Sequence, residues 1–358
     1  MRHAMITGWG KYVPPAVLAN SDLERVTETT DEWITTRTGI KERRVSHVKQ
    51  SDMAMVAGAR AIAAAGLEPT EIGLILNATC SPDRLIPASG SVIQDKLGAT
   101  NASALDINAA CSGFIYALTV GDQMIKGGAF DKVLVIGAEK LTPWLDFTDR
   151  ATAVLFGDGA GAVVLEATEE EVGLMSFELG SDGSQADILC VTHSASEEPA
   201  QHGHLPLLRM DGPEVFRRAV VAMGDASVRV VEEAGLTLDD VDLLIPHQAN
   251  VRIIDATARR LKLNPEQVFI NIASYGNTSA ATIPIALTEA LEEGRIQPGA
   301  NLVFAAFGGG LTWGAGVVRW GQRITPIAQS DVTLPDTDAT ALELLQPNID
   351  AYGTGIES

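Results

Sequence analysis

Three residues of different type, Cys111, His247 and Asn277, stand where apolar segments give way to small or polar residues. Cys111 lies between an apolar run predicted as a short buried strand (104–108) and a segment whose apolar residues recur at helical spacing. His247 directly follows the apolar run LLIP. Asn277 follows a predicted strand over 268–272 and precedes another helix. A thiolate is a nucleophile, so this set is suited to attack on a carbonyl.

The segment around Cys111 has the features of an activated nucleophile. A helix beginning at Ser112 would direct its free N–H groups and the positive end of its dipole at the sulfur, which favours the thiolate. The small residues Ser112 and Gly113 leave room for a substrate carbonyl. Cys80 and Cys190 have no such setting, and we interpret both as packing residues, the usual role of a lone cysteine beside a strand.

His247 differs in position from the other five histidines. It directly follows an apolar run, whereas the others lie near the terminus or in polar loops (His3, His47, His193, His202 and His204). The carboxyl ends of parallel strands meet at one edge of a sheet, where α/β proteins build their sites. Allowing for a repeat of these elements, we expect Cys111 and Asn277 at pseudo-symmetric positions with His247 nearby.

The elements that must hold these residues occur twice. AGLEPTEIGLIL at 65–76 and AGLTLDDVDLLI at 234–245 are displaced by 169 residues (65 to 234), as are VLVI at 133–136 and LVFA at 302–305. Duplicated short strands alternating with amphipathic helices predict an α/β protein with parallel or mixed sheets covered by helices. We place the halves at 1–172 and 173–325.

The last segment, 326–358, lacks this pattern. It contains six acidic residues and no Lys or Arg. Such a composition predicts a solvated, flexible acidic tail with at most a short helix near 339–345. Truncation after Gln322 is therefore expected to leave folding and activity near wild type.

Composition excludes several classes of function. The 358-residue chain is 46% hydrophobic and 20% charged, with a formal net charge of −20, which disfavours nucleic acid as a partner. No apolar run reaches the length of a membrane span and no cleavable signal pattern is recognised, so a cytoplasmic location without membrane association is expected. The three cysteines form no metal-binding pattern, and no metal site is predicted.

Six motifs, in the same order as in a known family, carry a resemblance to it. They are TTDEWITTRTGIKER (29–43), NAACSGF (108–114), DRATAVLFGDGAGA (149–162), IPHQANVRII (245–254), YGNTSAA (275–281) and FGGGLTWGA (307–315). On these motifs the chain resembles the β-ketoacyl-acyl-carrier-protein synthase III enzymes of the thiolase superfamily over about residues 3–320. The resemblance implies a thiolase-like fold in which the two halves form a layered αβαβα core.

The resemblance also implies roles for single residues. Cys111, His247 and Asn277 would form the catalytic set, and the backbone N–H groups of Cys111 and Gly309 an oxyanion hole. Trp33 and Arg150 would sandwich the adenine of coenzyme A. The pantetheine and nucleotide path would be lined by Thr29, Arg37, Gly212, Phe216 and Asn250. An acyl pocket would contain Leu141 and Phe156, with Ile86 entering from the partner of a homodimer.

The reaction implied is a decarboxylative Claisen condensation of an acyl-CoA with malonyl-acyl carrier protein, which initiates fatty-acid synthesis. It requires no metal or redox cofactor. Ile86 is smaller than the aromatic residue of some acetyl-specific relatives, which favours medium-chain starters, although Trp144 could close the same space. Arg252, Arg259 and Arg260 share one helix face after His247 and are predicted to dock the acidic carrier protein.

Three other functions were weighed against this one. A degradative thiolase is disfavoured because it would need a second cysteine in the last glycine-rich loop, and this chain has none after Cys190. A catalytically silent scaffold is disfavoured by the complete Cys-His-Asn set. A ketosynthase III-like acyltransferase that uses a longer acyl-CoA or another acceptor in specialised metabolism stays open.

Overall fold

The N-terminal half is built on a five-stranded mixed sheet. The computed structural model describes residues 2–192 and 206–353. The sheet has the order β1-β7-β6-β4-β5, in which β4 runs parallel to β5 and β6 while β7 runs antiparallel to β6 and β1. Its strands are β1 (His3–Tyr12), β4 (Leu74–Ala78), β5 (Ser103–Ile107), β6 (Lys132–Glu139) and β7 (Gly159–Thr168).

The C-terminal half repeats this arrangement with one strand fewer. Its sheet has the order β11-β12-β13-β8, with β11 and β12 parallel and the other pairs antiparallel. The strands are β8 (Gly173–Ser181), β11 (Leu243–Pro246), β12 (Asn301–Gly308) and β13 (Thr312–Arg319). The strand predicted over 268–272 is wrong: only an isolated bridge between Leu244 and Val268 forms, and a short helix, α9 (Ile272–Tyr275), follows.

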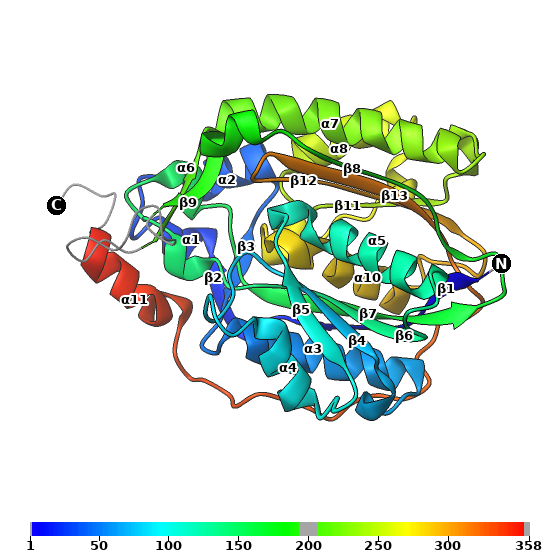
Figure 1. The fold of residues 1–358 in the computed structure, drawn as a ribbon. Helices are drawn as coiled ribbons and strands as arrows, with labels where there is room; N and C mark the ends of the chain where they lie inside the picture. Colours follow the sequence, from blue (N-terminus) through cyan, green and yellow to red (C-terminus); the bar gives the residue numbers. More distant parts are fainter. Residues whose placement is uncertain (1, 193–205, 354–358) are drawn as a thin grey trace.

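Helices cover both sheets and fill the space between them (Figure 1), which confirms the layered α/β architecture predicted from the repeat and the family resemblance. The outer helices are α3 (Gln50–Ala65) and α4 (Ser89–Leu97) on the first sheet, and α7 (Gly212–Glu233) and α8 (Val251–Arg260) on the second. The central layer consists of α5 (Gly113–Lys126) and α10 (Thr282–Glu292).

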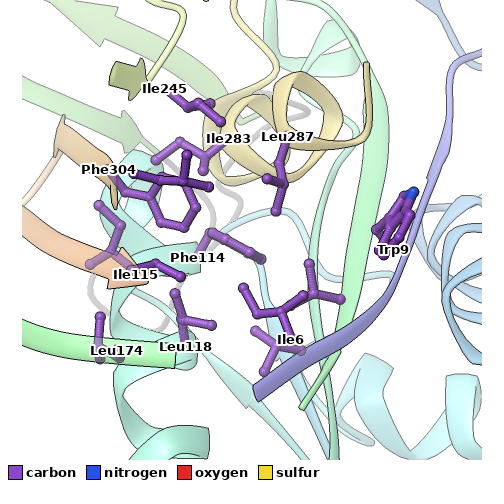
Figure 2. Close-up of a cluster of buried hydrophobic side chains, with 14 of the residues drawn as sticks. Ile6, Trp9, Phe114, Ile115, Leu118, Leu174, Ile245, Ile283, Leu287 and Phe304 are labelled. Atoms are coloured by element: carbon purple, nitrogen blue, oxygen red, sulfur yellow. The ribbon is translucent and has the colours of Figure 1, made fainter. Parts of the chain in front are cut away.

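The central layer packs in a large apolar core shared with both sheets. Figure 2 shows Phe114 and Ile115 of α5 beside Phe304 of β12, with Ile283 of α10 next to them. Each of these side chains is at most 1% exposed. Burial of four such side chains contributes on the order of 1.5–3 kcal/mol each. This core fixes the ends of α5 and α10 from which the candidate catalytic residues project.

The repeat is visible in the backbone and corrects one expectation. β11 begins 169 residues after the start of β4. β12 begins and ends 169 residues after the start and the end of β6. A 169-residue displacement pairs Asn108 with Asn277 and Cys111 with Ala280, and the two residues with positive φ, Ala110 (46°) and Ser279 (50°), also correspond. Asn277 is therefore the pseudo-symmetric partner of Asn108 and not, as predicted, of Cys111.

β5, the strand that leads to Cys111, lies at the edge of its sheet. The sequence predicts a buried strand there, but Leu105 is 42% exposed and Ser103 is exposed as well. A strand with a neighbour on one side only leaves backbone N–H and C=O groups unpaired along its free edge. The apolar composition that suggested burial thus belongs to an open edge.

Smaller elements gather at one end of the two sheets. They are β2 (Ala16–Ala19) and β3 (Glu42–Val45), which pair, β9 (Leu189–Thr192) and β10 (Leu207–Met210), which also pair, and the helices α1 (Asn20–Leu23), α2 (Asp31–Thr38) and α6 (Arg150–Ala153). Their apolar residues form a separate cluster that includes Leu141, Leu145 and Phe156.

The C-terminal segment is not the solvated tail that its acidity predicts. After β13 the chain runs past α3 and ends in α11 (Ala341–Tyr352), which lies beside α1 and β2 (Figure 1). Ala341 and Leu345 of this helix are buried in the same cluster as Leu141. Two apolar residues one turn apart form a buried stripe even within an acidic helix, which the overall composition conceals.

Candidate functional site

Cys111 occupies a constrained turn between β5 and α5. A single 3₁₀ turn, η2 (Ala110–Ser112), joins the two elements, and α5 begins at Gly113, one residue later than predicted. The backbone N–H of Ala110 donates to Asn108 Oδ1 at 3.2 Å, and Thr312 Oγ1 donates to the carbonyl of Ala109 at 2.9 Å. Cys111 itself is 7% exposed. The turn therefore holds the thiol at the start of a helix and against the β12–β13 hairpin.

Asn277 occupies the equivalent turn of the second half. The 3₁₀ turn η7 (Ser279–Ala281) leads into α10, and the Asn277 Oδ1 accepts from the Ser279 N–H at 2.8 Å. Its backbone is fixed on both sides, because its N–H donates to the carbonyl of Leu155 and its own carbonyl accepts from Gly157. Since the amide oxygen is engaged, the NH₂ of Asn277 is the group left to donate to a substrate.

His247 directly follows β11 and is 1% exposed. Its backbone N–H donates to the carbonyl of Ala305, and its ring Nδ1 lies 2.7 Å from Thr282 Oγ1. Burial lowers the pKa of His247 to about 3, so the imidazole is neutral near pH 7. A neutral ring carries one N–H only, and the contact with Thr282 decides which nitrogen has it.

One hydrogen-bond network joins the two turns. The Ser279 hydroxyl contacts the Cys111 thiol and donates to Glu139 Oε1 at 3.1 Å. Thr282 Oγ1 lies 2.9 Å from the carbonyl of Ser279 and 2.7 Å from His247 Nδ1. Because Ser279 is also bonded to Asn277, the structure brings all three predicted catalytic residues into one neighbourhood.

Glu139 is a buried carboxyl group that the sequence analysis missed. It ends β6 and accepts hydrogen bonds from Thr79 and from the backbone and side chain of Ser81, as well as from the Cys80 thiol and N–H. Burial raises its pKa above the ordinary value, although these donors act in the opposite direction. Nothing local in GAEKL distinguishes this glutamate, because its partners lie on the loop after β4 and on η7.

The charge state of Cys111 differs from the expectation. Burial raises the pKa of the thiol to about 12, and the contacts with Ser279 and with the backbone oppose this only in part. The resting residue is therefore a thiol and not the thiolate predicted from the helix end. A cysteine that is 7% exposed loses most of the hydration that stabilises an anion, and the half-charge of one helix terminus does not replace it.

Gly308, the last residue of β12, and Gly309 pack against the turn that carries Cys111. A Cβ added to Gly308 would fall 2.6 Å from the backbone nitrogen of Cys111, and one on Gly309 would lie 3.7 Å from Cβ of Ala110. The absence of side chains at both positions lets the backbone of this loop approach the nucleophile closely. Such an approach is required of two N–H groups that are to share one oxyanion.

Most residues predicted to bind coenzyme A lie around Trp33. The guanidinium groups of Arg37 and Arg150 lie 4.8 and 4.9 Å from its ring centroid, and the Asn250 side chain donates to the carbonyl of Arg37 at 3.0 Å. Arg150 is thus in direct cation–π contact with Trp33, and an adenine enters between them only if Arg150 moves. Thr29 Oγ1 is buried and has no hydrogen-bond partner among the described residues.

Gly212 and Phe216 both belong to the first turns of α7. Gly212 is the first residue of this helix, and Arg252 lies 4.8 Å over the Phe216 ring. Arg252, Arg259 and Arg260 are exposed on α8, as their spacing predicts. Arg260 is paired with Asp225 at 2.8 Å, so its charge is partly compensated.

The predicted acyl-pocket residues are separated into two places. Leu141 and Phe156 are buried in one apolar cluster together with Leu145, and Phe156 forms an isolated backbone bridge with Asn277. Ile86 lies elsewhere, on a loop where it is 87% exposed. Trp144 packs at the margin of the same cluster. Ile86 therefore belongs to no pocket of its own chain.

Within residues 2–192 and 206–353, no helix is both long and apolar enough to cross a membrane. His193, His202 and His204 lie outside the described residues.

Comparison with known proteins places the chain in a family. Two family models match: the 3-oxoacyl-[acyl-carrier-protein] synthase III model at residues 105–183 and the model of the C-terminal part of the same enzymes at residues 231–320. β-Ketoacyl-[acyl-carrier-protein] synthase III 2 of Vibrio vulnificus (strain YJ016) is 51% identical over 97% of this chain and 97% of its own. The synthase III of Geobacillus kaustophilus (strain HTA426) is 51% identical over 89% of this chain and 99% of its own.

The two relatives differ in where they match. The Vibrio alignment leaves only 3% of this chain uncovered, so it includes most of the C-terminal extension. The Geobacillus protein aligns over 99% of its own length but covers only 89% of this chain. Among solved structures, 3-oxoacyl-[acyl-carrier-protein] synthase III from Aquifex aeolicus VF5 is 46% identical, with a TM-score of 0.84 over 88% of this chain and 100% of its own. On this identity over nearly its whole length, the chain belongs to the β-ketoacyl-acyl-carrier-protein synthase III family.

Proposed function

We propose that Cys111 carries the acyl group while His247 and Asn277 generate the carbanion that attacks it. As a member of this family the chain is an acyltransferase that condenses an acyl-CoA with malonyl-acyl carrier protein and so initiates fatty-acid synthesis. The network from Cys111 through Ser279 to Asn277, Thr282 and His247 is the observation that supports this division, because it joins a nucleophile to two donors.

The first step transfers the acyl group. The Cys111 sulfur attacks the thioester carbonyl of acyl-CoA, and the backbone N–H groups of Cys111 and Gly309 stabilise the tetrahedral oxyanion. The carbon–sulfur bond to coenzyme A breaks, and the proton of the Cys111 thiol balances the departing thiolate. Trp33 and Arg150 hold the nucleotide end of the substrate, with Thr29, Arg37, Gly212, Phe216 and Asn250 along the path.

The second step forms the new carbon–carbon bond. His247 Nε2–H and the NH₂ of Asn277 donate to the thioester oxygen of malonyl-acyl carrier protein, and the enolate that they stabilise forms as carbon dioxide leaves. Its carbon attacks the acyl-cysteine, the carbon–sulfur bond to Cys111 breaks, and the 3-oxoacyl product leaves together with the Cys111 thiolate, which takes up a proton from water. Thr282 Oγ1 donates to the carbonyl of Ser279 at 2.9 Å and lies 2.7 Å from Nδ1, so Nε2 donates in this step when that hydroxyl turns its proton from Ser279 to Nδ1. Neither step requires electrons from a redox cofactor, and the absence of any cofactor stays a prediction.

The test of this function is product formation from defined substrates. The purified protein, acetyl-CoA or hexanoyl-CoA and malonyl-acyl carrier protein are combined, and the carrier protein is weighed by mass spectrometry. A carrier protein bearing the 3-oxoacyl group is expected, with carbon dioxide released in equal amount. Failure with acyl-CoA starters of two to ten carbons would instead favour a specialised acyltransferase with another acceptor.

Docking of the acidic carrier protein is assigned to α8. Arg252 and Arg259 are exposed in a chain whose net charge is −20, so they form a local positive spot. Their replacement by Glu should raise the Michaelis constant for malonyl-acyl carrier protein and leave acylation by acyl-CoA unchanged. Arg260→Glu should have a smaller effect in the same direction, because the charge of Arg260 is already partly compensated by Asp225. Equal effects on both substrates would reject the docking site.

A homodimer is supported by the open edge of the first sheet. The free edge of β5 and the exposed Leu105 lie on the same strand, and Leu85 and Ile86 are 76% and 87% exposed on a neighbouring loop. Pairing of two β5 strands would cover this edge and could carry Ile86 to the partner's acyl pocket. Sedimentation of wild type and Leu105→Asp tests it: the variant should dissociate. The cytoplasmic location stays a prediction.

A further inference from the structure

The C-terminal extension, residues 323–353, is anchored along its whole length to the N-terminal half. Arg323 donates to the carbonyl groups of Thr7 and Ala65, and the N–H of Ile327 donates to the carbonyl of Ala64. Farther on, His47 Nε2 lies 2.7 Å from the carbonyl of Pro335. These contacts guide the chain across the first half and place α11 beside the turn that follows Leu141 (Figure 1).

Asn348 of α11 holds that turn directly. Its side chain is buried, and its Nδ2 donates to the carbonyl oxygens of Thr142, Pro143 and Leu145 at 3.2, 2.9 and 3.1 Å. The two hydrogens of one NH₂ group are thus shared among three carbonyls around the 3₁₀ turn η3 (Thr142–Trp144). An asparagine buried at such a position supplies donors that the turn cannot find within itself.

The same turn is held from the opposite side by the body of the protein. The backbone N–H and the hydroxyl of Thr142 donate to the buried carboxylate of Asp158 at 3.0 and 2.7 Å. Leu345, one turn before Asn348, packs in the apolar cluster that contains Leu141 and Phe156. The extension therefore contacts, through one polar and one apolar residue, the wall of the pocket assigned to the acyl chain.

We propose that the C-terminal extension determines the acyl-chain preference by fixing the 141–145 turn through Asn348 and Leu345. This inference rests on the proposed function, because it takes Leu141 and Phe156 as lining the acyl pocket. Without Asn348, the carbonyls of Pro143 and Leu145 lose this donor and that of Thr142 keeps only the N–H of Leu145 at 3.3 Å, so the turn moves toward water to recover hydrogen bonds. The wall of the acyl pocket at Leu141 then moves outward, and the pocket accepts longer acyl groups.

The test compares single variants, since truncation after Gln322 can unfold the protein. Asn348→Ala and Leu345→Ala remove the two contacts, and Gln346→Ala, an exposed residue of the same helix, is the matched control. Each protein is given an equimolar mixture of acetyl-, butyryl-, hexanoyl- and octanoyl-CoA, and the acyl groups on the Cys111 peptide are quantified by mass spectrometry. Thermal unfolding is measured in parallel.

The proposal expects the ratio of octanoyl to acetyl product to rise about tenfold in Asn348→Ala and Leu345→Ala, the scale on which small changes of an apolar pocket alter selection. Gln346→Ala should keep the wild-type ratio. An equal slowing of all acyl groups with a lowered melting temperature would overturn the proposal, since the extension would then only stabilise the fold. An unchanged ratio in both variants would also overturn it. If wild type takes up no acyl group at all, the proposed function itself fails.

Discussion

The turns at Cys111 and Asn277 have the same backbone conformation but carry different functional side chains. In each, an asparagine Oδ1 accepts from the N–H two residues later, a residue with positive φ follows, and a 3₁₀ turn leads into a helix of the central layer. The corresponding positions differ in what they present. The first turn carries a thiol where the second has Ala280, and Asn108 is exposed whereas Asn277 is 6% exposed.

This difference shows how two copies of one structural unit can each perform one step of a two-step reaction. The 3₁₀ turn and the helix that follows it supply two rigid sites that face one another, and substitution decides which becomes the nucleophile and which becomes the donor. Ser279 at the second turn has a hydroxyl where Ala110 has a methyl group, and that hydroxyl reaches Glu139 and the Cys111 thiol. The two halves are therefore coupled through the residue at which the strained backbone is repeated.

The largest effect is expected from removing the thiol. Cys111→Ala should abolish the covalent acyl-enzyme completely, because Ala280 at the equivalent position offers no nucleophile. The variant should still decarboxylate malonyl-acyl carrier protein, since His247 and Asn277 remain. The measurements are the mass of the 111 peptide after incubation with acyl-CoA and the release of labelled carbon dioxide. Covalent uptake by Cys111→Ala would place the nucleophile elsewhere.

The two equivalent asparagines should differ by orders of magnitude. Asn277→Ala removes a donor to the developing enolate and should lower decarboxylation about a hundredfold or more, with acylation of Cys111 maintained. His247→Ala should do the same. Asn108→Ala removes the matching contact in the other turn and should change decarboxylation little. Similar losses in Asn108→Ala and Asn277→Ala would mean that both act only on the backbone.

The Thr282–His247 contact sharpens the role of the second turn. Thr282→Val removes the hydroxyl that lies 2.7 Å from Nδ1, so the ring proton is no longer directed to one nitrogen and decarboxylation should fall on the order of tenfold or more. Thr282→Ser keeps the hydroxyl and should restore the rate. Nitrogen NMR of labelled His247 should show a single tautomer in wild type and a mixture in Thr282→Val.

The pH dependence follows from the same residue. Burial lowers the pKa of His247 to about 3, so the ring stays neutral as the pH falls through 6.5. The decarboxylation rate should therefore show no inflection near pH 6.5 between pH 5 and 8. An inflection there would indicate that His247 is hydrated in the working enzyme. For the preceding experiment, an unchanged His247 tautomer in Thr282→Val would exclude Thr282 from the mechanism.

Part of this site could be predicted from the sequence because strand ends and helix starts are local patterns. Cys111 and His247 follow apolar runs that form strands, whereas Asn277 was selected from a strand predicted over 268–272 that does not form, and the family resemblance supported it independently. Glu139 could not be found in this way, because its burial is created by Ser279 and by the loop after β4, far away in the chain. The same holds for the charge state of Cys111, which is set by desolvation and not by its neighbours in sequence.

The paired strands were predicted because they repeat along the sequence. The packing of the C-terminal segment onto the N-terminal half was not predicted. The 169-residue displacement identified the paired strands without any knowledge of their contacts. The acidity of residues 326–358 suggested a solvated tail, yet Leu345 and Asn348 are buried because a complementary apolar cluster and three carbonyl groups lie opposite them. Composition describes the average of a segment, whereas two residues suffice to anchor a helix.

The smallest effects are expected from the backbone of the two turns, and here the comparison can be broken most cleanly. Ala110→Gly relieves a positive φ that costs a residue with a side chain on the order of 1 kcal/mol, but glycine loses a similar amount through its freer unfolded chain, so the free energy of unfolding should change by less than about 1 kcal/mol. Ser279→Gly relieves the same angle and also deletes the hydroxyl. Glu139, buried among other donors, then loses one partner, and a decrease of about 1–3 kcal/mol is expected. Denaturant unfolding of both variants measures the difference. Equal values would show that the Ser279 hydroxyl contributes nothing to the coupling of the two halves.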